Sequence, residues 1–371
     1  MAALAAALAV AAIAQAPPPA SPFGSYQDPI AALAQQLGAG TTGNPVGARH
    51  GGAPTDATTA AWQEYEEGIA HYDPAYGASW IYPAETAQLW KANQATLGAP
   101  EQSTLDRTPS PNQGNCAQKK GLGGTITYFT GGGIVLVNGN SPVILKGATW
   151  VKYLQLDDAS GDLGPPIPNK GPFQGAGSGP LAPLVTGFAC GWIVEAVSAS
   201  GIAPAYYMID TSPIAKAHQG GLWSLVGYPI TDESKVIKSF QVGNTQRFSA
   251  GVIYYSPSTG TQGLSASLPN VAGRKSLLEE YEGTYGGPKG IMGFPTSAIQ
   301  KILVTDPNGA TVSVYALDTA NGVLVWHPSS AGQGMPWGTT QAFTSVAVFF
   351  SDFKTYGCDN CPFGSDQVEG R

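Results

Sequence analysis

The side chains in this sequence that could do acid–base chemistry are pairs of adjacent carboxylic acids. The pairs are Asp157 with Asp158, Asp232 with Glu233, and Glu279 with Glu280. Two carboxylates about 5–10 Å apart can cleave a glycosidic bond. Neighbouring acids in turns and on helices more often cap a helix or face solvent. We therefore predict no catalytic residue and no enzyme, and we keep a glycoside hydrolase with a paired-carboxylate site as an alternative.

Other catalytic and metal-binding patterns are also weak. The sequence has no Gly-x-Ser-x-Gly and no His-Glu-x-x-His motif. One Ser-x-x-Lys, from Ser351 to Lys354, lacks the companion motifs of that chemistry. The four histidines are scattered, at His50, His71, His218 and His327. We predict no metal site and no cofactor.

Aromatic side chains are the stronger candidates, because sugar rings stack on indole and phenol faces while carboxylates and amides bond the hydroxyls. The chain has 8 Trp and 16 Tyr. Candidate carbohydrate-binding residues are Tyr72, Tyr254, Tyr255, Trp326, Trp192, Trp223, Trp337 and Asp232. The alternative is that Tyr72, Tyr255 and Trp326 pack in a core. Strand alternation puts Tyr254 on the opposite face, so we expect one of the two sets to be exposed.

Four cysteines occur, at Cys116, Cys190, Cys358 and Cys361. An even number in an exported chain indicates two disulfides, which we predict to be Cys116–Cys190 and Cys358–Cys361. A Cys-x-x-Cys redox motif needs a helix N-terminus to activate its thiol, whereas Cys358 and Cys361 lie in a turn-rich end. Free, metal-bound and redox-active cysteines remain alternatives.

Composition limits the class of protein. Of 371 residues, 43% are hydrophobic and only 12% are charged, with 49 Gly and 30 Pro. This profile is typical of a turn-rich, β-containing extracellular chain. The net charge of −7 argues against nucleic acid or an anionic membrane as a partner, since both need a basic surface.

The N-terminal residues resemble an export signal. Residues 1–16 form an Ala/Leu/Val run that ends in Ala14-Gln15-Ala16, as a signal peptide with a small-residue cleavage site does. No Lys or Arg precedes Arg49, so an Ala-rich disordered end is the alternative. Residues 17–41 are predicted to be a Pro/Ala/Gly-rich linker with one helical segment, Ile30 to Leu37. We expect a secreted, extracellular protein that associates with the cell wall and has no inserted membrane segment.

Two signatures recur through the rest of the chain. Phe248 to Gly260 reads FSAGVIYYSPSTG, and Tyr65 to Gly77 reads YEEGIAHYDPAYG. Related copies place the signature glycine at Gly68, Gly132, Gly191, Gly251 and Gly322. A second signature, an apolar residue followed by Gly-x-Pro, has its glycine at Gly98, Gly164, Gly227 and Gly293, and at either Gly43 or Gly52 in the first copy. Regular spacing of two interleaved signatures predicts tandem repeats.

Each copy predicts a loop, a β-hairpin and a short helix. Apolar residues alternate after the signature glycine, a Pro/Gly turn follows, and helices are expected over 85–95, 148–156, 212–218 and 275–281. The expected repeats are 42–96, 97–162, 163–225, 226–291 and 292–362, with a disordered tail over 363–371. Such a unit cannot bury its apolar face alone, so neighbours must stack. The last copy ends in a strand-like run, 342–353.

The two signatures resemble the LGFP repeat. The closest copy is 226–291, with VGYPITDE, FSAGVIYYSPSTG and LLEEYEGTYGG. The resemblance implies a β-rich α+β fold of five pseudo-symmetric units, and with the low repeat number it favours closure into a propeller-like ring. It also implies an exported, non-enzymatic module that binds cell-wall glycan in mycolate-bearing bacteria. Assembly into a surface layer or filament is a further alternative.

Overall fold

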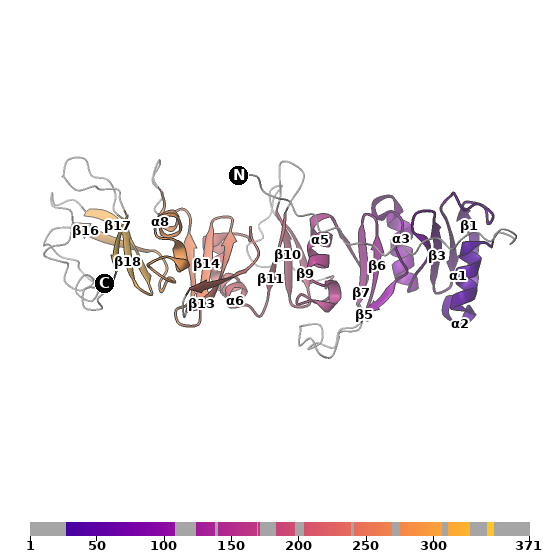
Figure 1. The fold of residues 1–371 in the computed structure, drawn as a ribbon, viewed down its shortest axis with the longest axis horizontal. Coiled ribbons are helices and arrows are strands. Elements are labelled where there is room, and N and C mark those ends of the chain that lie inside the picture. The colour runs from indigo at the N-terminus through magenta and orange to yellow at the C-terminus, as the bar shows by residue number, and fades with distance from the viewer. Residues whose placement is uncertain are drawn as a thin grey trace. The chain divides into compact units, whose positions relative to one another are not determined.

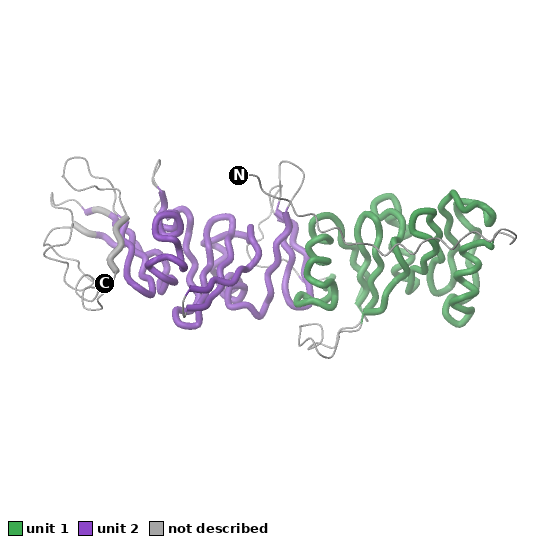
Figure 2. Tube along the Cα trace, viewed as in Figure 1, with its two compact units in different colours: residues 1–168 green, residues 169–371 purple. Residues whose placement is uncertain are grey.

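The computed structural model describes residues 27–107, 124–137, 140–168, 170, 183–196, 204–238, 241–268, 275–305, 311–326 and 340–344 (Figure 1). It divides into two compact units, residues 1–168 and residues 169–371 (Figure 2). The predicted signal peptide and C-terminal tail lie outside the described residues, as do Trp337, Cys116, Cys358 and Cys361.

The first unit contains two four-stranded antiparallel sheets and the helices that accompany them. Helices α1 (Pro29–Leu37) and α2 (Ala39–Thr42) precede the first sheet. That sheet has β1 (Pro45–Gly51), β2 (Ala61–Tyr65), β3 (Gly68–Asp73) and β4 (Gly77–Ile81), followed by α3 (Ala84–Leu97). The second has β5 (Leu105–Arg107), β6 (Gly124–Phe129), β7 (Gly132–Val137) and β8 (Val143–Lys146). Helix α5 (Gly147–Gln155) and the 3-10 turn η1 (Asp158–Ser160) follow.

The second unit contains three more antiparallel sheets. The third sheet has β9 (Leu184–Phe188), β10 (Gly191–Glu195) and β11 (Ala205–Ile209), followed by α6 (Pro213–Ala217), the π-helical η2 (His218–Leu222) and α7 (Trp223–Val226). The fourth has β12 (Ser234–Lys238), β13 (Gln241–Phe248), β14 (Gly251–Ser256) and β15 (Gly260–Ser265), then α8 (Leu277–Gly283) and η3 (Gly287–Lys289). The fifth has β16 (Gln300–Thr305), β17 (Thr311–Thr319), β18 (Gly322–Trp326) and β19 (Thr340–Thr344).

The sequence signatures mark equivalent places in these five sheets. Every signature glycine is the first residue of a strand, namely β3, β7, β10, β14 or β18. Each sheet pairs strands that are consecutive in the chain, so a β-meander replaces the predicted single hairpin. The four predicted helices are present as α3, α5, α6 and α8, with ends shifted by one to a few residues. Of the predicted terminal strand, 342–353, only the part within β19 lies in the described residues.

The glycine of each Gly-x-Pro needs a backbone conformation that other residues rarely adopt. The φ angles of Gly98, Gly164, Gly227 and Gly293 are 74°, 66°, 80° and 71°. Gly43 has a φ of 70°, whereas Gly52 is not among the positive-φ glycines, so Gly43-Asn44-Pro45 is the first copy. A left-handed residue here ends the preceding helix or turn and redirects the chain.

Equivalent hydrogen bonds join four of the five Gly-x-Pro sites to the turn before a signature glycine. In the second sheet, the backbone N–H groups of Thr130 and Gly131 donate to the carbonyls of Ala99 (3.1 Å) and Leu97 (2.8 Å). The corresponding donors in the fourth and fifth sheets are Ser249 and Ala250, which bond Tyr228 and Val226, and Ala320 and Asn321, which bond Phe294 and Met292. In the first sheet Glu66 and Glu67 donate to Asn44 and Thr42, which again identifies Gly43.

The carbonyl of the Gly-x-Pro glycine also receives a side-chain donor in four places. The donors are Thr42 Oγ1 to Gly43 (3.1 Å), Trp90 Nε1 to Gly98 (2.9 Å), His218 Nε2 to Gly227 (2.7 Å) and Tyr281 Oη to Gly293 (2.6 Å). Buried backbone carbonyls require such partners. Each donor comes from the helical segment before the glycine, so it fixes that segment on the next sheet.

Within each unit a helix packs between two consecutive sheets. Trp90 of α3 packs with Ile81 of the first sheet and Phe129 of the second. Tyr281 of α8 packs with Tyr254 of the fourth sheet and Trp326 of the fifth. Helix α6 lies in the same way between the third and fourth sheets. Each fully buried large side chain contributes roughly 1.5–3 kcal/mol, so each of these helices stabilises the two sheets that it contacts.

Part of the predicted linker belongs to the fold. Helix α1 begins at Pro29, with Asp28 accepting a hydrogen bond from the backbone N–H of Ile30 (3.1 Å). Ile30 is 2% exposed and packs with Ala70 and Trp80 of the first sheet. The predicted helical segment, Ile30 to Leu37, is therefore present as α1, and its packing on the first sheet was not predicted from the Pro- and Ala-rich composition.

The predicted closure of the five units into a ring is not observed in the described residues. No closed barrel or propeller is found in the described residues, where the five sheets are separate. The propeller-like ring therefore stays a prediction. Within the same described residues, no helix has the length and apolar character needed to cross a membrane.

Candidate functional site

Three of the predicted carbohydrate platforms are core residues. Tyr254 and Trp326 are each 2% exposed, and Trp192 is 6% exposed. The Tyr254 ring meets Tyr281 edge-on at 5.7 Å, and the Lys170 ammonium lies 4.1 Å from the Trp192 ring centroid. Their faces are covered by protein, so the expectation that these rings would be presented to a ligand is wrong.

The expectation of one exposed strand face is wrong for the same reason. On β14, Tyr254 packs in the cluster around α8, whereas Tyr255 packs against the cluster around α6. On β18 both Val325 and Trp326 are buried. Both faces of β14 therefore pack against other elements, although Tyr255 is only half-buried, and the sequence pattern of a single hairpin did not reveal the second layer.

The other predicted residues lie nearer to the surface. Tyr72, Tyr255 and Trp223 are half-buried. The Tyr72 hydroxyl donates to the carbonyl of Ala57 (2.9 Å). Asp232 is also half-buried and accepts a hydrogen bond from the backbone N–H of Tyr207 (3.1 Å), which joins the third sheet to the loop before the fourth.

The adjacent acids have structural partners. Glu233 accepts hydrogen bonds from Asn244 and from Ser212, the N-cap of α6. Glu279 forms a capping box with Ser276 at the start of α8. Asp158 accepts hydrogen bonds from Arg107 (2.9 Å) and Tyr128 (2.8 Å). These contacts support the helix-capping and turn interpretation of the acids.

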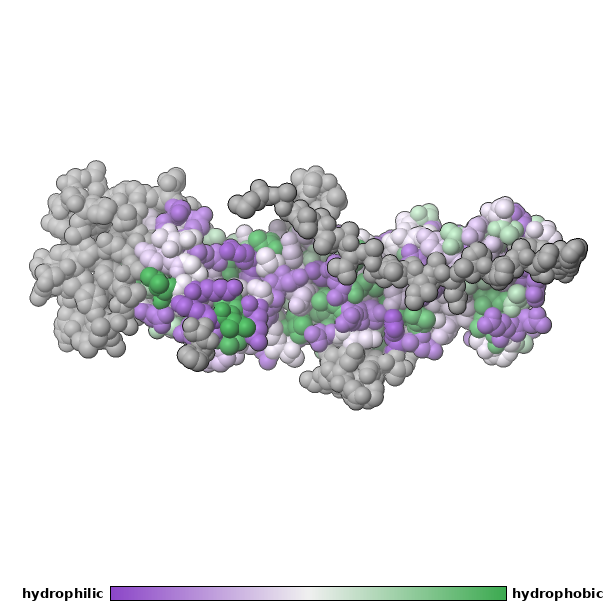
Figure 3. Space-filling view, viewed as in Figure 1, coloured by the Kyte–Doolittle hydropathy of each residue, from purple (hydrophilic) through white to green (hydrophobic). Residues whose placement is uncertain are grey.

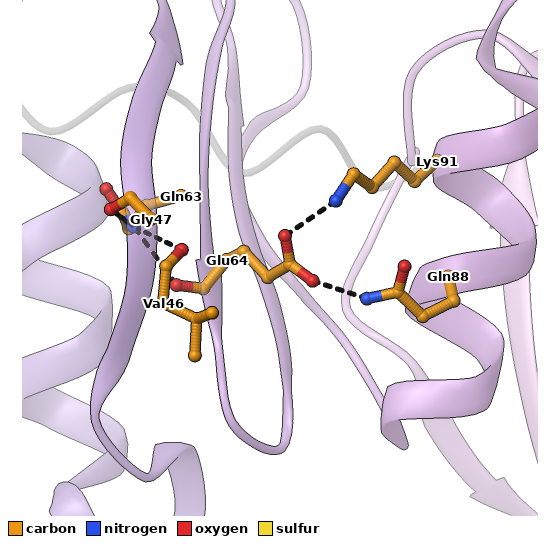
Figure 4. Close-up of polar contacts among 6 residues, drawn as sticks. All are labelled: Val46, Gly47, Gln63, Glu64, Gln88 and Lys91. Carbon is orange, nitrogen blue, oxygen red and sulfur yellow. Dashed lines mark hydrogen bonds and ion pairs between the residues drawn. The ribbon is translucent and has the colours of Figure 1, made fainter.

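A surface cluster that the sequence analysis missed lies on the first sheet beside α3. We call it the Trp62 cluster, and it consists of His50, Trp62, Glu64, Gln88 and Lys91. Trp62 and Glu64 alternate on β2 and therefore share one face. Figure 4 shows Glu64 pointing toward α3, where it meets Gln88 and Lys91. Trp62 is half-buried, whereas His50, Gln88 and Lys91 are exposed.

Hydrogen bonds hold the Glu64 carboxylate in a fixed position. Lys91 Nζ lies 2.7 Å from Glu64 Oε2, and Gln88 donates to the other oxygen. The hydrogen bond from Lys91 lowers the pKa of Glu64 most, and burial opposes it. Glu64 is therefore an anion with both oxygens directed at α3.

Rings surround Trp62. The His50 imidazole lies parallel to the indole, with centroids 3.8 Å apart and an angle of 13°. Trp90 meets Trp62 edge-on at 6.1 Å, and Lys91 Nζ lies 5.6 Å from the Trp62 ring centroid. The cluster thus combines an aromatic ring with a carboxylate, an amide, an ammonium and an imidazole, which are the groups that a polar ring-shaped ligand would use.

Beside Trp62, directly opposite it on β3, lies His71, which is 5% exposed and meets Trp90 edge-on at 5.3 Å. Burial lowers the pKa of His71 to about 4, so the imidazole is neutral near pH 7. Its Nδ1 has no hydrogen-bond partner among the described atoms, and the same holds for Ser79 Oγ on the neighbouring strand. The sheet next to Trp62 therefore carries two buried polar side chains, His71 and Ser79.

The ion pair in this cluster has a counterpart in the fourth repeat. Alignment of Tyr65 with Phe248 places Glu64 on Arg247, and Arg247 bonds Glu282 of α8. The charges are reversed, but the tie between a sheet and the following helix is the same. Glu64 with Lys91 is thus a repeated structural tie, and His50 with Trp62 is the part of the cluster particular to the first repeat.

The sequence contains only a faint signal for this site. Trp62 and Glu64 in AWQEY follow strand alternation, but nothing in the sequence pairs them with α3 or places His50 opposite Trp62. Among the described residues, no group of three or more His, Cys, Asp or Glu is placed to hold a metal ion.

Exposed apolar side chains offer no comparable site on the face seen in Figure 3. Hydrophobic residues on the described part of that face form small separate groups among hydrophilic ones. Ile237 and Val242, which are paired across β12 and β13, are 58% and 42% exposed. Single exposed aliphatic residues of this kind are ordinary on protein surfaces.

Cys190 lies in the turn between β9 and β10 and is 6% exposed. Its predicted partner Cys116 lies outside the described residues, as do Cys358 and Cys361. The two predicted disulfides therefore stay predictions.

Comparison with known proteins agrees with the repeat signatures in one copy. No curated protein matches the chain. Residues 226–268, which run from the end of α7 through the fourth sheet, match the family model of the LGFP repeat.

Proposed function

We propose that the chain is a secreted, non-enzymatic module that binds or anchors to cell-wall or extracellular carbohydrate. The observation that carries this proposal is the Trp62 cluster, in which a half-buried indole lies beside a carboxylate, an amide and an ammonium group. An apolar sugar face can stack on such a ring while the polar side chains bond its hydroxyls. The match of residues 226–268 to the LGFP repeat supports the same function.

In this proposal the four other sheets are further copies of the LGFP unit, and the five copies close into a propeller-like ring. Equivalent positions of the signature glycines and of Gly-x-Pro support the common origin of the copies. Half-buried Tyr72, Tyr255 and Trp223 are secondary contact residues. Several weak sites on one chain would add through avidity when the ligand is a polymer.

Sedimentation with purified cell walls, followed by a glycan array, tests the proposal. The wild-type chain is expected to pellet with walls, and Trp62→Ala should reduce the bound fraction at least several-fold. Tyr76→Ala is the matched control, because Tyr76 is a 47% exposed aromatic residue in the turn between β3 and β4, outside the Trp62 cluster. Equal binding of Trp62→Ala and Tyr76→Ala would show that the Trp62 cluster does not contact the glycan.

Two other outcomes would favour the alternative functions. Release of reducing sugar from the walls, lost on neutralising one acid pair, would indicate a glycoside hydrolase. Light scattering that rises with protein concentration in the absence of walls would indicate assembly into a layer or filament. The structural partners of Asp158, Glu233 and Glu279 make the first outcome the less expected one.

A further inference from the structure

One face of the Trp62 indole is already occupied by a ring of the protein itself. The His50 imidazole lies parallel to it at a centroid separation of 3.8 Å and an angle of 13°. A pyranose ring that stacks on tryptophan uses the same parallel position at a similar distance. A sugar that uses this face of Trp62 must therefore displace His50.

The structure around His50 permits this displacement. His50 is exposed and lies on β1, an edge strand that pairs only with β2. The pairing register between β1 and β2 shifts between Val46 and His50, and Gly47 and Gly51 have φ angles of 75° and 85°. An exposed side chain on such a segment can change rotamer without moving the core.

The backbone beneath His50 is nevertheless held. Gln63 Nε2 donates to the carbonyls of Gly47 (3.2 Å) and Val46 (3.4 Å), as Figure 4 shows. Arg49 bonds the carbonyl of Gly52 and forms an ion pair with Asp28 at 2.7 Å. The strand thus stays in place while the His50 side chain is free to rotate.

We propose that His50 is a displaceable cover on a sugar-stacking subsite formed by Trp62, and that a neutral or hydroxyl-rich pyranose replaces it. This inference rests on the proposed function, because it assigns the ligand that uses the uncovered ring. The amide oxygen of Gln88 and the remaining protons of the Lys91 ammonium would then bond the sugar hydroxyls, while Glu64 keeps both side chains in position. His50 competes with the ligand and lowers the affinity of the site.

The size of the effect follows from what a cross-strand ring pair contributes. His50 and Trp62 are directly opposite in the β1–β2 ladder. Such pairs stabilise a sheet by an amount equivalent to about a two- to fivefold change in an equilibrium constant. Removing the cover should strengthen glycan binding by about the same factor.

Four variants of the full-length chain test the cover in wall sedimentation and in direct titration with soluble wall oligosaccharide. His50→Ala should bind about two- to fivefold more tightly than wild type. His50→Phe keeps a flat ring over the indole and should bind no better than wild type. Trp62→Ala should weaken glycan binding, and the double variant with His50→Ala should not regain the tighter binding of His50→Ala alone. Val46→Ala, on the same edge strand, is the matched control and should bind as wild type does.

A second readout separates failure of the cover from failure of the proposed function. Acrylamide quenching, taken as the difference between each chain and its Trp62→Phe form, measures access to the Trp62 ring without any sugar. The quenching constant should rise in His50→Ala and stay low in His50→Phe. Unchanged quenching in His50→Ala, or weaker binding by His50→Ala, would overturn the cover. If quenching rises in His50→Ala but no chain binds glycan, His50 does cover the Trp62 ring. The carbohydrate-binding function and the assigned ligand would then be rejected.

Discussion

At the scale of single residues, the most consistent feature is the carbonyl of the Gly-x-Pro glycine, which is buried at Gly293 and part-buried at Gly43, Gly98 and Gly227. Thr42, Trp90, His218 and Tyr281 donate to it in different repeats. A hydroxyl, an indole N–H, an imidazole and a phenol are chemically distinct, so the repeated contact leaves no repeated residue type. This explains why the sequence signatures revealed the glycine but not its partner.

Removing one of these donors should destabilise the fold. Tyr281→Phe leaves the Gly293 carbonyl buried without its side-chain donor, which should cost about 1–3 kcal/mol. Denaturant unfolding followed by circular dichroism measures the loss as a lower midpoint. Tyr76→Phe, on an exposed ring, should leave the midpoint unchanged. Equal midpoints for wild type and Tyr281→Phe would show that water or another group satisfies the carbonyl.

Mild acid should weaken the fold through buried histidines. Burial lowers the pKa of His71 to about 4 and also lowers the pKa of His218. An unfolded imidazole titrates near about 6.5, so below that pH the unfolded state binds a proton that the native state does not. Stability is therefore complete above about pH 6.5 and falls until the folded pKa is reached. For His71 the full loss is about 3 kcal/mol.

Urea midpoints between pH 7 and pH 4.5 measure this dependence. His71→Gln should flatten the slope over that interval, whatever its effect on stability at pH 7. Asp56→Asn is the control, because Asp56 has a pKa of about 2 and titrates below this interval. A slope that is the same in His71→Gln and wild type would contradict the prediction.

At the scale of elements, helices α3, α6 and α8 each pack between two consecutive sheets. The sequence predicted α3, α5, α6 and α8 because each has an apolar pattern that ends before a Gly-x-Pro. It did not predict which aromatic rings would be covered, because coverage depends on the layer contributed by the adjacent copy. It also missed the outer strands β1, β5, β12 and β16, whose residues alternate poorly and lie at sheet edges.

Two alanine substitutions separate the cost of a positive φ angle from the cost of steric crowding at the Gly-x-Pro glycine. An alanine Cβ at Gly98 would have a left-handed backbone and would lie 2.0 Å from Thr130 Oγ1. An alanine at Gly260, with a φ of 72°, would meet nothing within 4 Å. Backbone strain costs about 1–2 kcal/mol in both, and Gly98→Ala must also displace Thr130.

Thermal and urea unfolding of the two variants measure the two contributions. Gly260→Ala should lose about 1–2 kcal/mol, and Gly98→Ala should lose more. Gly220→Ala, at an exposed glycine where a Cβ meets nothing within 4 Å and φ is not positive, is the reference. Similar losses in Gly98→Ala and Gly220→Ala would show that the redirecting conformation is not required.

At the scale of the whole molecule, the signature glycines indicated five β segments, and the described residues contain five separate sheets, whereas the five-repeat interpretation and its closure into a ring stay predictions. Five signature glycines open five strands in five sheets, as the spacing of the repeats indicates. Ring closure depends on surfaces that belong to different copies, and no periodicity specifies them. In the first unit, α1 covers one face of the first sheet, so a ring would have to close through another part of that repeat.

The predicted disulfides belong to this scale because one of them would join two repeats. Peptide mapping of the unreduced, thiol-blocked chain should yield a Cys116–Cys190 peptide pair and a Cys358–Cys361 peptide. Closing the loop between Cys116 and Cys190 should stabilise the folded chain by about 4 kcal/mol in the chain-entropy model. Alkylation of Cys190 without prior reduction would contradict the pairing.

The equivalent left-handed glycines have a consequence for changes in chain length. Gly227 and Gly293 bracket one sheet and one helix, and each is followed two residues later by Pro, at Pro229 and Pro295. Excision of residues 228–293 would fuse Gly227 to Phe294 and restore an intact Gly-Phe-Pro corner at the splice. Gene rearrangements that cut at these corners can thus lose or gain a complete module, whereas cuts elsewhere would leave a helix without one of its two sheets.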